Sequence, residues 1–345
     1  FFSQQVYLEC GLLTMKGDFV AFIEVENLVK TFQVAKRRRG MWGAVKGLFH
    51  REYQIVKALD EISFSVDEGE LVGYIGPNGA GKSTTVKVLS GILVPDGGKV
   101  RVLGKVPWQQ RIETVRQLGV VFGQRTQLWW DLPVIESFDL LRDIYGVEQS
   151  DHINVRDELI ERWNISELLD TPVRQLSLGQ RMRCDLAASL LHAPPILFLD
   201  EPTIGLDVVS KLNVRDFVRT LNKERGTTVM LTTHDMDDIE ALCSRVLVIS
   251  EGGIYLDGTV DEIRRRVSDE RNLIVDLEAL DEDIAVERAT IHRREGHRVW
   301  LRFRPEEISA AELISMVAAK NKIRDLFVEN PPIEEVVASL YEEAK

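Results

Sequence analysis

The stretch that decides the fold is a glycine-rich loop that reads Gly76-Pro77-Asn78-Gly79-Ala80-Gly81-Lys82-Ser83-Thr84. Glycine has no Cβ, so the backbone here can turn successive N–H groups toward one point, where phosphate oxygens accept them. Lys82 adds a positive charge for the β- and γ-phosphates, and the Ser83 hydroxyl is placed to bind Mg²⁺. A loop used only as a turn would not need Lys-Ser at its end. We therefore interpret it as a P-loop for a nucleoside triphosphate.

The sequence around this loop predicts an α/β fold. The apolar run 71–75 is typical of a buried strand, and 84–89 is typical of a helix whose positive N-terminus faces the phosphates. Further apolar runs that predict strands occur at 118–122, 196–199, 228–232 and 246–249. Strands that alternate with helices indicate a mostly parallel sheet covered on both faces.

Composition limits the function classes. The chain has 345 residues, of which 44% are hydrophobic and 28% charged, as in an ordinary globular protein. Its net charge of -12 argues against general nucleic-acid binding, which needs a basic surface. Cys10, Cys184 and Cys243 form no Cys-x-x-Cys pair, so neither a disulfide framework nor a zinc site is indicated. No apolar run reaches the roughly 18 residues of a membrane helix, so we expect any membrane role to come through partners.

The predicted organisation has three parts, and the second of them carries an insertion. We expect 1–19 to be a poorly ordered or non-native extension, and 20–267 to be the main domain. Within it we expect a helical subdomain at 127–175, with helices at 135–145 and 155–169. An insertion at 33–57 carries the basic run 36–39 followed by Trp42, Val45 and Phe49 at near-helical spacing. It is either an amphipathic helix that docks on a surface or a solvated charged loop.

Residues 268–345 predict a small α+β domain with strands at 273–277, 290–293, 299–303 and 323–328 and helices at 309–320 and 333–341. His292 and His297 are interpreted as surface histidines.

Acidic residues complete the predicted site. Asp200 and Glu201 follow the apolar run 196–199, which places them at the carboxyl end of a strand, where ligands bind in such sheets. Asp200 can hold Mg²⁺ through water, and Glu201 is the candidate general base for an attacking water. His234 ends a neighbouring strand. A lone histidine is usually structural, but one at this position can reach a γ-phosphate.

Several ordered motifs then carry a family resemblance. The run Leu176-Ser177-Leu178-Gly179-Gln180-Arg181 is similar to a Leu-Ser-Gly-Gly-Gln signature, and Gln124, Gly205-Leu206-Asp207 and His234 stand at the Q-loop, D-loop and switch-histidine positions. With the P-loop and Leu199-Asp200-Glu201-Pro202, residues 20–265 resemble the ATPase subunits of ABC transporters. In detail the chain is similar to the ABC-2-type exporter branch, whose members are drug-resistance and sodium-export-like ATPases. The resemblance implies an ABC ATPase domain in which an antiparallel β subdomain and the helical subdomain join the parallel sheet.

The resemblance also implies cofactors, partners and roles. ATP and Mg²⁺ would be bound in a head-to-tail dimer, between the P-loop of one copy and the signature of the other. Ser83, Gln124 and Asp200 would surround the metal, whereas Ser177, Gly179, Gln180 and Asp207 would complete the partner's nucleotide site. Lys82, Glu201 and His234 would be catalytic. The dimer would drive permease subunits, which hold it at the cytoplasmic face of the membrane, and no nucleic acid is expected as partner. Leu178 departs from the family's usual glycine.

Aromatic residues are assigned by the same resemblance. Phe32 fits as the adenine-stacking residue by the residues before it, and Tyr53 fits by its spacing to Ala58-Leu59, so both stay candidates. Trp129 and Trp130 lie where the family receives the permease's coupling helix. We expect one of them to be buried and the other to lie near that interface.

Two other functions compete with transport. The first is an ABC-type ATPase that acts on ribosomes or nucleic acid. A single nucleotide-binding unit, the lack of a long coiled-coil insertion and the acidic charge argue against it. The second is an interaction protein regulated through its C-terminal domain, where the sequence contains no recognisable ligand motif.

Overall fold

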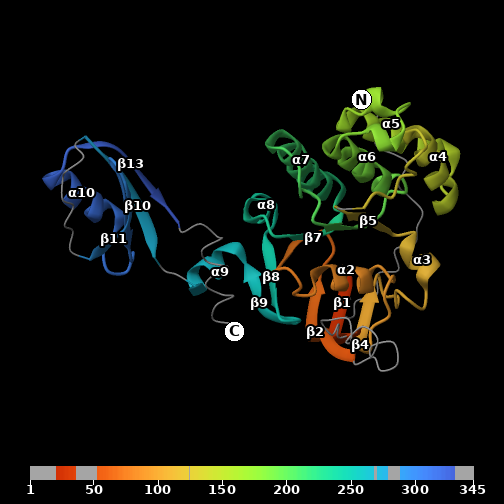
Figure 1. The fold of residues 1–345 in the computed structure, drawn as a ribbon, viewed down its shortest axis with the longest axis horizontal. Coiled ribbons are helices and arrows are strands. Elements are labelled where there is room, and N and C mark those ends of the chain that lie inside the picture. Colours follow the sequence, from red (N-terminus) through yellow and green to blue (C-terminus); the bar gives the residue numbers. More distant parts are fainter. Residues whose placement is uncertain (1–20, 36–52, 124, 268–269, 279–287, 331–345) are drawn as a thin grey trace, which may run out of the picture.

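The structure is a computed structural model that describes residues 21–35, 53–123, 125–267, 270–278 and 288–330. The predicted extension at 1–19, Gln124 and the predicted helix at 333–341 lie outside these ranges. Figure 1 shows a main body and a second, smaller sheet beyond helix α9 (Val260–Val267). None of the helices within the described ranges is long and apolar enough to cross a membrane.

A six-stranded sheet forms the centre of the main body. Its order is β5 (Leu118–Phe122), β6 (Ile196–Asp200), β7 (Thr228–Thr233), β3 (Leu71–Ile75), β8 (Arg245–Ser250) and β9 (Gly253–Thr259). The strands run parallel except β9, which pairs antiparallel with β8. Every residue of β3, β6 and β7 is buried, because helices cover both faces. The predicted mostly parallel α/β sheet is confirmed.

Helices surround this sheet (Figure 1). Those beside the sheet are α2 (Lys82–Leu89), α3 (Arg111–Val115), α7 (Val208–Arg225) and α8 (Met236–Leu242). Those between β5 and β6 are α4 (Val134–Tyr145), α5 (Gln149–Trp163) and α6 (Leu178–Leu190). The sequence pattern gave α5 wrong bounds, 155–169. The helix ends at Trp163 because Asn164 adopts a left-handed conformation, and a short 3-10 turn at Ser166–Leu168 follows.

An antiparallel sheet of β2 (Tyr53–Val66), β1 (Ile23–Ala35) and β4 (Gly97–Val102) packs against α2. The predicted insertion at 33–57 is wrong at both ends. Residues 33–35 and 53–57 continue the two strands, with Gln33 opposite Ile55 and Ala35 opposite Tyr53. Aromatic and β-branched residues in these segments favour strand pairing over a helix. The rest of the insertion, 36–52, lies outside the described residues.

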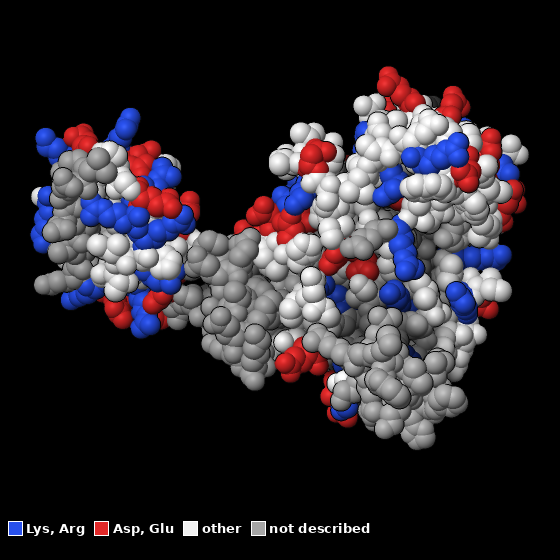
Figure 2. All heavy atoms as spheres, viewed as in Figure 1, with Lys and Arg blue, Asp and Glu red and all other residues white. Residues whose placement is uncertain are grey.

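The smaller sheet has the order β11 (Ala289–Glu295), β12 (Arg298–Phe303), β10 (Arg271–Leu277) and β13 (Ile323–Glu329). Helix α10 (Ala310–Lys320) covers one face, where Leu273, Val275, Leu301 and Leu313 form a separate apolar core. Acidic and basic side chains are interspersed over this part in Figure 2. These strands and the helix occur where the sequence predicts them, and His292 and His297 are exposed. The domain boundary at 268 stays a prediction.

Candidate active site

The glycine-rich loop connects β3 to α2, and its shape requires glycine at two positions. Gly81 has a φ of 111°, and a Cβ placed on it would lie 2.4 Å from the carbonyl oxygen of Ala58. A Cβ on Gly76 would lie 2.4 Å from the carbonyl oxygen of Ile249. The loop is therefore held between the two sheets with no room for side chains at these points, which fits a backbone cradle for phosphate.

Lys82 lies deep in this loop and is 6% exposed. Its Nζ donates to the carbonyl oxygens of Gly76 at 2.7 Å and Pro77 at 3.2 Å. Burial lowers the pKa of Lys82, while the charges of Glu201 and Asp200 act in the opposite direction. The ammonium group is thus placed at the head of the loop, next to both carboxylates.

Asp200 ends β6 and faces the start of α2. Its Oδ1 accepts hydrogen bonds from Ser83 Oγ at 3.1 Å and from Thr232 Oγ1 at 2.5 Å. A carboxylate beside a hydroxyl is the oxygen-rich donor set that Mg²⁺ prefers, so Ser83 and Asp200 fit the metal that the sequence predicts. The third predicted ligand, Gln124, lies outside the described residues.

Glu201 has an unusual backbone conformation. Its φ of 55° is left-handed, which is costly for a residue with a side chain. The Glu201 N–H donates to the carbonyl oxygen of Thr232 at 2.9 Å. Gly123 lies against its other side, since a Cβ on Gly123 would lie 2.0 Å from the carbonyl oxygen of Glu201. Strained residues of this kind concentrate at functional sites when the surrounding structure fixes them.

The two predicted catalytic side chains at the strand ends lie close together. His234 Nδ1 is 3.5 Å from Glu201 Oε1. Both are partly open to solvent, at 57% and 21% side-chain exposure. A cavity of about 340 Å³ opens beside Glu201, and it is lined by Ser83, Lys87, Ile92, Phe122, Gly123, Arg125, Asp200 and Glu201. The sequence did not single out Thr232 and Gly123, because a strand threonine and an isolated glycine have no distinctive spacing.

A second missed group holds the His234 turn. Asp238 is fully buried and accepts hydrogen bonds from Thr203 Oγ1 and from Arg215 Nε, both at 2.5 Å. Lys211 pairs with Asp235 at 2.5 Å. The contacts of Lys211 and Arg215 bind helix α7 to Asp235 and Asp238, which follow His234 in the chain. Lys211 and Arg215 are four positions apart, which is also the pattern of an ordinary solvated helix, so the sequence did not reveal their role.

The signature residues form the start of α6. Ser177 is the N-cap, and it forms a capping box with Gln180: Gln180 N donates to Ser177 Oγ, and Ser177 N donates to Gln180 Oε1. Asp207 caps α7 through Ser210 N and Ser210 Oγ, and these hydrogen bonds hold the pKa of Asp207 below its usual value. A Cβ on Gly179 would lie 2.8 Å from Ser210 Oγ. The signature and Asp207 therefore meet within one chain.

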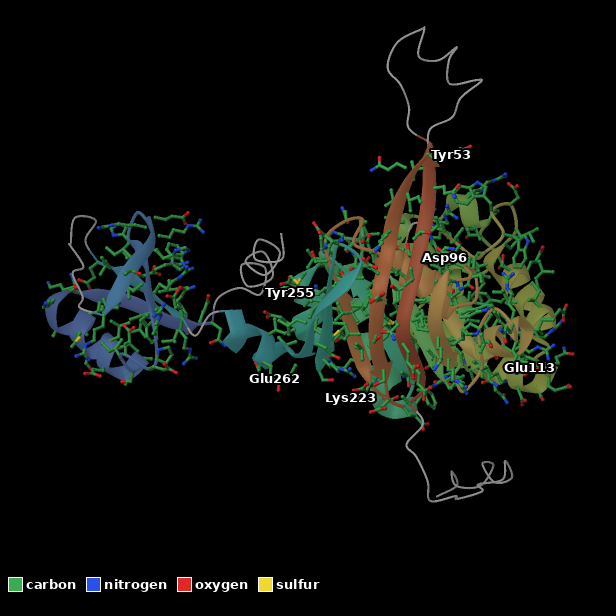
Figure 3. All side chains as sticks on the ribbon, turned by 90° about the horizontal axis from the view of Figure 1, so that it is seen from below. Tyr53, Asp96, Glu113, Lys223, Tyr255 and Glu262 are labelled. Carbon is green, nitrogen blue, oxygen red and sulfur yellow. The ribbon has the colours of Figure 1, made fainter. Side chains whose placement is uncertain are left out.

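The aromatic candidates have different surroundings. Phe32 is 37% exposed on β1, and Lys30 Nζ lies 5.7 Å from the centroid of its ring. Tyr53 is 55% exposed, and Figure 3 shows it at the far end of the β1–β2 ribbon. Trp129 and Trp130 are both exposed, at 37% and 51%, so the expectation that one of them is buried is wrong. The buried apolar position is instead taken by Leu128.

Comparisons with known proteins identify the family. A model described as "ABC transporter" matches residues 59–204. The daunorubicin resistance ATP-binding protein DrrA3 of Streptomyces coeruleorubidus is 37% identical over 229 residues, which cover 66% of this chain and 72% of the relative. The chain belongs to the ATP-binding proteins of ABC transporters. As an ABC ATPase, it binds nucleotide and hydrolyses ATP, which confirms the enzyme class that the sequence predicts.

Other relatives agree with this family. The ABC ATPase is 30% identical to the ABC transporter ATP-binding protein NatA of Bacillus subtilis, with 62% of this chain and 87% of the relative covered. It is 32% identical to the linearmycin resistance protein LnrL of the same species, with 65% and 72% covered. Among solved structures, an ATP-binding subunit of an ABC transporter matches with a TM-score of 0.60 at 25% identity, covering 71% of this chain and 92% of that one.

Proposed function

We propose that this ABC ATPase works as a pair of identical chains that close head to tail around two ATP molecules with Mg²⁺. The observation that carries the proposal is the exposed surface beside the signature. Val208 and Val209 follow Asp207 directly and are 74% and 66% exposed, and Leu212 on the next turn is 50% exposed. Apolar residues gathered at one helix start favour burial against a partner surface. A second copy, with its P-loop facing Ser177 and Gly179, would provide that surface.

Within each site the residues divide the work. The loop N–H groups and Lys82 bind phosphate oxygens, while Ser83 and Asp200 hold Mg²⁺. Bound ATP supplies the phosphoryl group that passes to water. Glu201 accepts the proton of that water at its carboxylate, and His234 orients Glu201 from 3.5 Å. Most of the rate then comes from positioning and charge stabilisation, as in other phosphoryl transfers.

Phe32 is the better of the two candidates for stacking on adenine. Phe32 pairs with Val56 on the neighbouring strand. Val56 is two positions before Ala58, whose carbonyl oxygen lies against Gly81 of the P-loop. Asp96 fixes the neighbouring residue, because Thr31 N donates to its carboxylate at 2.6 Å. Tyr53 is five positions from Ala58, or roughly 17 Å along an extended strand. We therefore propose Phe32.

Glu201→Gln tests the paired site. We expect this variant to bind ATP, to lose at least about 100-fold in ATPase rate because the base is removed, and to form an ATP-dependent dimer visible by light scattering. Glu251→Gln is the matched control, since Glu251 also has a left-handed φ, 49°, but lies in an exposed turn. Near-normal turnover in Glu201→Gln would contradict the role of Glu201. A variant that binds ATP and stays monomeric would contradict the pairing.

We further propose that the pair drives the permease subunits of an exporter and is held at the cytoplasmic face of the membrane by them. The names of two relatives, which refer to daunorubicin and linearmycin resistance, support export. The exposed pair Trp129 and Trp130 offers an anchor for a permease helix. Purification of the tagged chain from membranes should recover hydrophobic membrane subunits. Co-sedimentation with ribosomes in their place would favour the competing function.

A further inference from the structure

Asp185 is a buried carboxylate that the catalytic scheme does not use. It is 4% exposed in the middle of α6, and its neighbours Cys184, Leu186 and Ala187 are fully buried apolar residues. Burial raises the pKa of Asp185 to about 6, although hydrogen bonds from Thr126 and Gln127 and the charge of Arg181 act against the rise. A core helix position would be more stable with an apolar residue, so the carboxylate calls for a specific role.

The partners of Asp185 all belong to the loop after β5. Thr126 Oγ1 donates to its Oδ1 at 2.7 Å, and Gln127 N donates to the same oxygen at 3.0 Å. Gln127 Nε2 donates to the backbone oxygen of Asp185 at 2.9 Å. Leu128 N in turn donates to Thr126 Oγ1 at 3.1 Å. One helical residue therefore fixes both the backbone and the side chains of this loop.

The other end of the same loop contacts the backbone of Asp200 and Glu201, the two residues whose carboxylates belong to the candidate site. Gly123 N donates to the carbonyl oxygen of Asp200 at 2.8 Å, and Gly123 packs against the backbone of Glu201. Arg125 N donates to the carbonyl oxygen of Phe122 at 2.9 Å. Gly123 thus contacts the end of β6, whereas Thr126 and Gln127, on the other side of Gln124 in the chain, contact α6.

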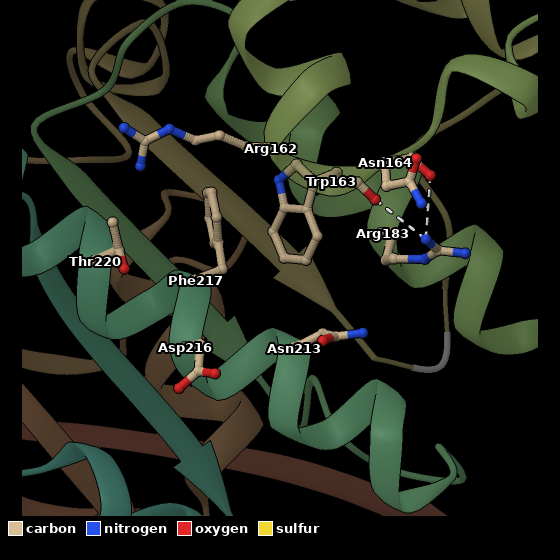
Figure 4. Close-up of a pocket in the computed structure, with 8 residues that line it drawn as sticks. All are labelled: Arg162, Trp163, Asn164, Arg183, Asn213, Asp216, Phe217 and Thr220. Carbon is tan, nitrogen blue, oxygen red and sulfur yellow. Dashed lines mark hydrogen bonds between the residues drawn. The ribbon is translucent and has the colours of Figure 1, made fainter.

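Helix α6 is continuous from its N-terminal signature to Asp185 and beyond. Asp185 is seven residues after Leu178, or about 10 Å along the axis. Two residues before it, Arg183 Nη1 donates to the carbonyl oxygens of Trp163 and Asn164 at 3.1 and 3.2 Å, which fastens α6 to the end of α5 (Figure 4). These residues border a cavity of about 420 Å³ in front of α7. Arg183 therefore binds α6 to its neighbouring helix, whereas Asp185 binds it to the catalytic loop.

We propose that Asp185 is a positioning residue that couples the catalytic carboxylates to the signature, by tying the loop that starts at Gly123 to helix α6. The inference rests on the proposed pairing of two copies. When the end of β6 shifts with its nucleotide, the tie carries that shift along α6 to Ser177 and Gly179, which face the partner. Without the hydrogen bonds of Asp185 to this loop, each site still binds ATP. The signature is then no longer held in the position that the nucleotide of the second copy requires.

The test measures ATP-driven dimerisation in the Glu201→Gln background, with Mg²⁺ and ATP as the only added ligands. Asp185→Ala should raise the ATP concentration for half-maximal dimer about tenfold, the range that such coupling contacts carry. Thr126→Val should act in the same direction, and adding it to Asp185→Ala should bring no further loss, because both remove one tie. Asp185→Asn should stay close to the parent, since its amide oxygen can accept both hydrogen bonds. ATP binding to the monomer should not change.

Leu186→Ala is the matched control, because it destabilises the same helix without touching the loop. We expect it to lower the melting temperature and leave the ATP dependence of dimerisation unchanged. An equal shift in Leu186→Ala, or strictly additive losses in the double variant of Asp185 and Thr126, would overturn the coupling role. So would an unchanged dimer in Asp185→Ala. Failure of Glu201→Gln itself to dimerise would instead contradict the proposed pairing.

Discussion

At the scale of single residues, the candidate active site contains a strained glutamate. The left-handed backbone of Glu201 is fixed by Thr232 on one side and by Gly123 on the other. In this conformation the carboxylate of Glu201 lies 3.5 Å from His234 Nδ1. Gly123 makes the arrangement possible, because no other residue leaves room for the Glu201 carbonyl.

Gly123→Ala should therefore damage catalysis while sparing the P-loop. The added Cβ would lie 2.0 Å from the Glu201 carbonyl oxygen, so the glutamate must move. We expect ATPase activity to fall about 100-fold or more, as for other misplaced catalytic groups, with ATP affinity within a few-fold of normal. Gly253→Ala is the control, because its Cβ would meet nothing closer than 3.8 Å. Normal ATPase activity in Gly123→Ala would refute this constraint.

Asp185 should make the free energy of unfolding of the protein depend on pH. Its pKa is raised from 3.8 to about 6, so the folded state holds the proton more tightly than the unfolded state. The stability contributed by protonation is complete below about pH 4 and is lost as the pH rises through about 6. The shift of roughly two units corresponds to about 3 kcal/mol. The asparagine in Asp185→Asn cannot ionise. The free energy of unfolding of this variant should therefore increase relative to that of the wild type as the pH rises from 4 to 7.

Urea unfolding at a series of pH values measures this difference. Asp157→Asn serves as control, because Asp157 is exposed and pairs only with its neighbour Arg156 among the contacts described. A gap between Asp185→Asn and wild type that stays constant from pH 4 to 7 would show that Asp185 keeps an ordinary pKa.

At the scale of elements, the signature is a helix start supported by its own chain. The capping box of Ser177 and Gln180 satisfies the first turn of α6, and Gly179 packs closely against Ser210 at the start of α7. Leu178, the departure from the usual glycine, packs toward Gly205, where its Cδ2 lies 2.9 Å from the position of an added Cβ. The leucine side chain thus adds a contact between the start of α6 and the segment around Gly205, and it leaves the hydrogen bonds of the capping box in place.

The two signature positions should respond differently to mutation. Leu178→Gly should change ATPase activity by only a few-fold, because the capping box remains and the helix loses roughly 1 kcal/mol of propensity. Gly179→Asp should abolish activity, since its Cβ would lie 2.8 Å from Ser210 Oγ and its charge would repel phosphate. Steady-state ATPase assays compare the two variants. Equal and small effects would remove the signature from the nucleotide site.

The sequence predicted elements well where one period or motif dominates. The strands of the central sheet follow from their apolar runs, and Asp200, Glu201 and His234 follow from the positions where those runs end. Trp129 and Trp130 were placed wrongly because a pattern of apolar residues does not say which of them faces the core, and Leu128 does so here. The sequence did not predict the contributions of Thr232, Gly123 and Asp238, because their roles arise from contacts between segments that are distant in the chain.

At the scale of the whole molecule, the exposed tryptophans link the ATPase to its proposed permease. Trp129 and Trp130 precede α4 on the surface, and Arg181 of the signature helix lies 5.7 Å from the ring of Trp130. A permease segment that rests on this pair would thus touch a side chain of α6 directly. The contact would connect transport with the position of the signature.

Replacing both tryptophans by alanine should uncouple transport from hydrolysis. We expect substrate export to fall about tenfold or more while basal ATPase activity stays within about twofold, because large aromatic anchors carry most of an interface's energy. Leu140→Ala, at another exposed apolar residue of the same region, is the control. Transport assays in vesicles that contain the whole transporter measure both rates. Unchanged transport would exclude the pair from coupling.

The segments of β2 and β8 that pack against the glycine-rich loop have a consequence for folding. Ala58 of β2 backs Gly81, Ile249 of β8 backs Gly76, and Asp60 N donates to the carbonyl oxygen of Gly252 at 2.9 Å. Segments nearly 200 positions apart in the chain must therefore meet before the loop acquires its shape. Such distant contacts form late, because they close long stretches of chain. ATP affinity should thus appear only at the end of refolding, and a fragment that contains the loop but begins after residue 66 should bind no ATP.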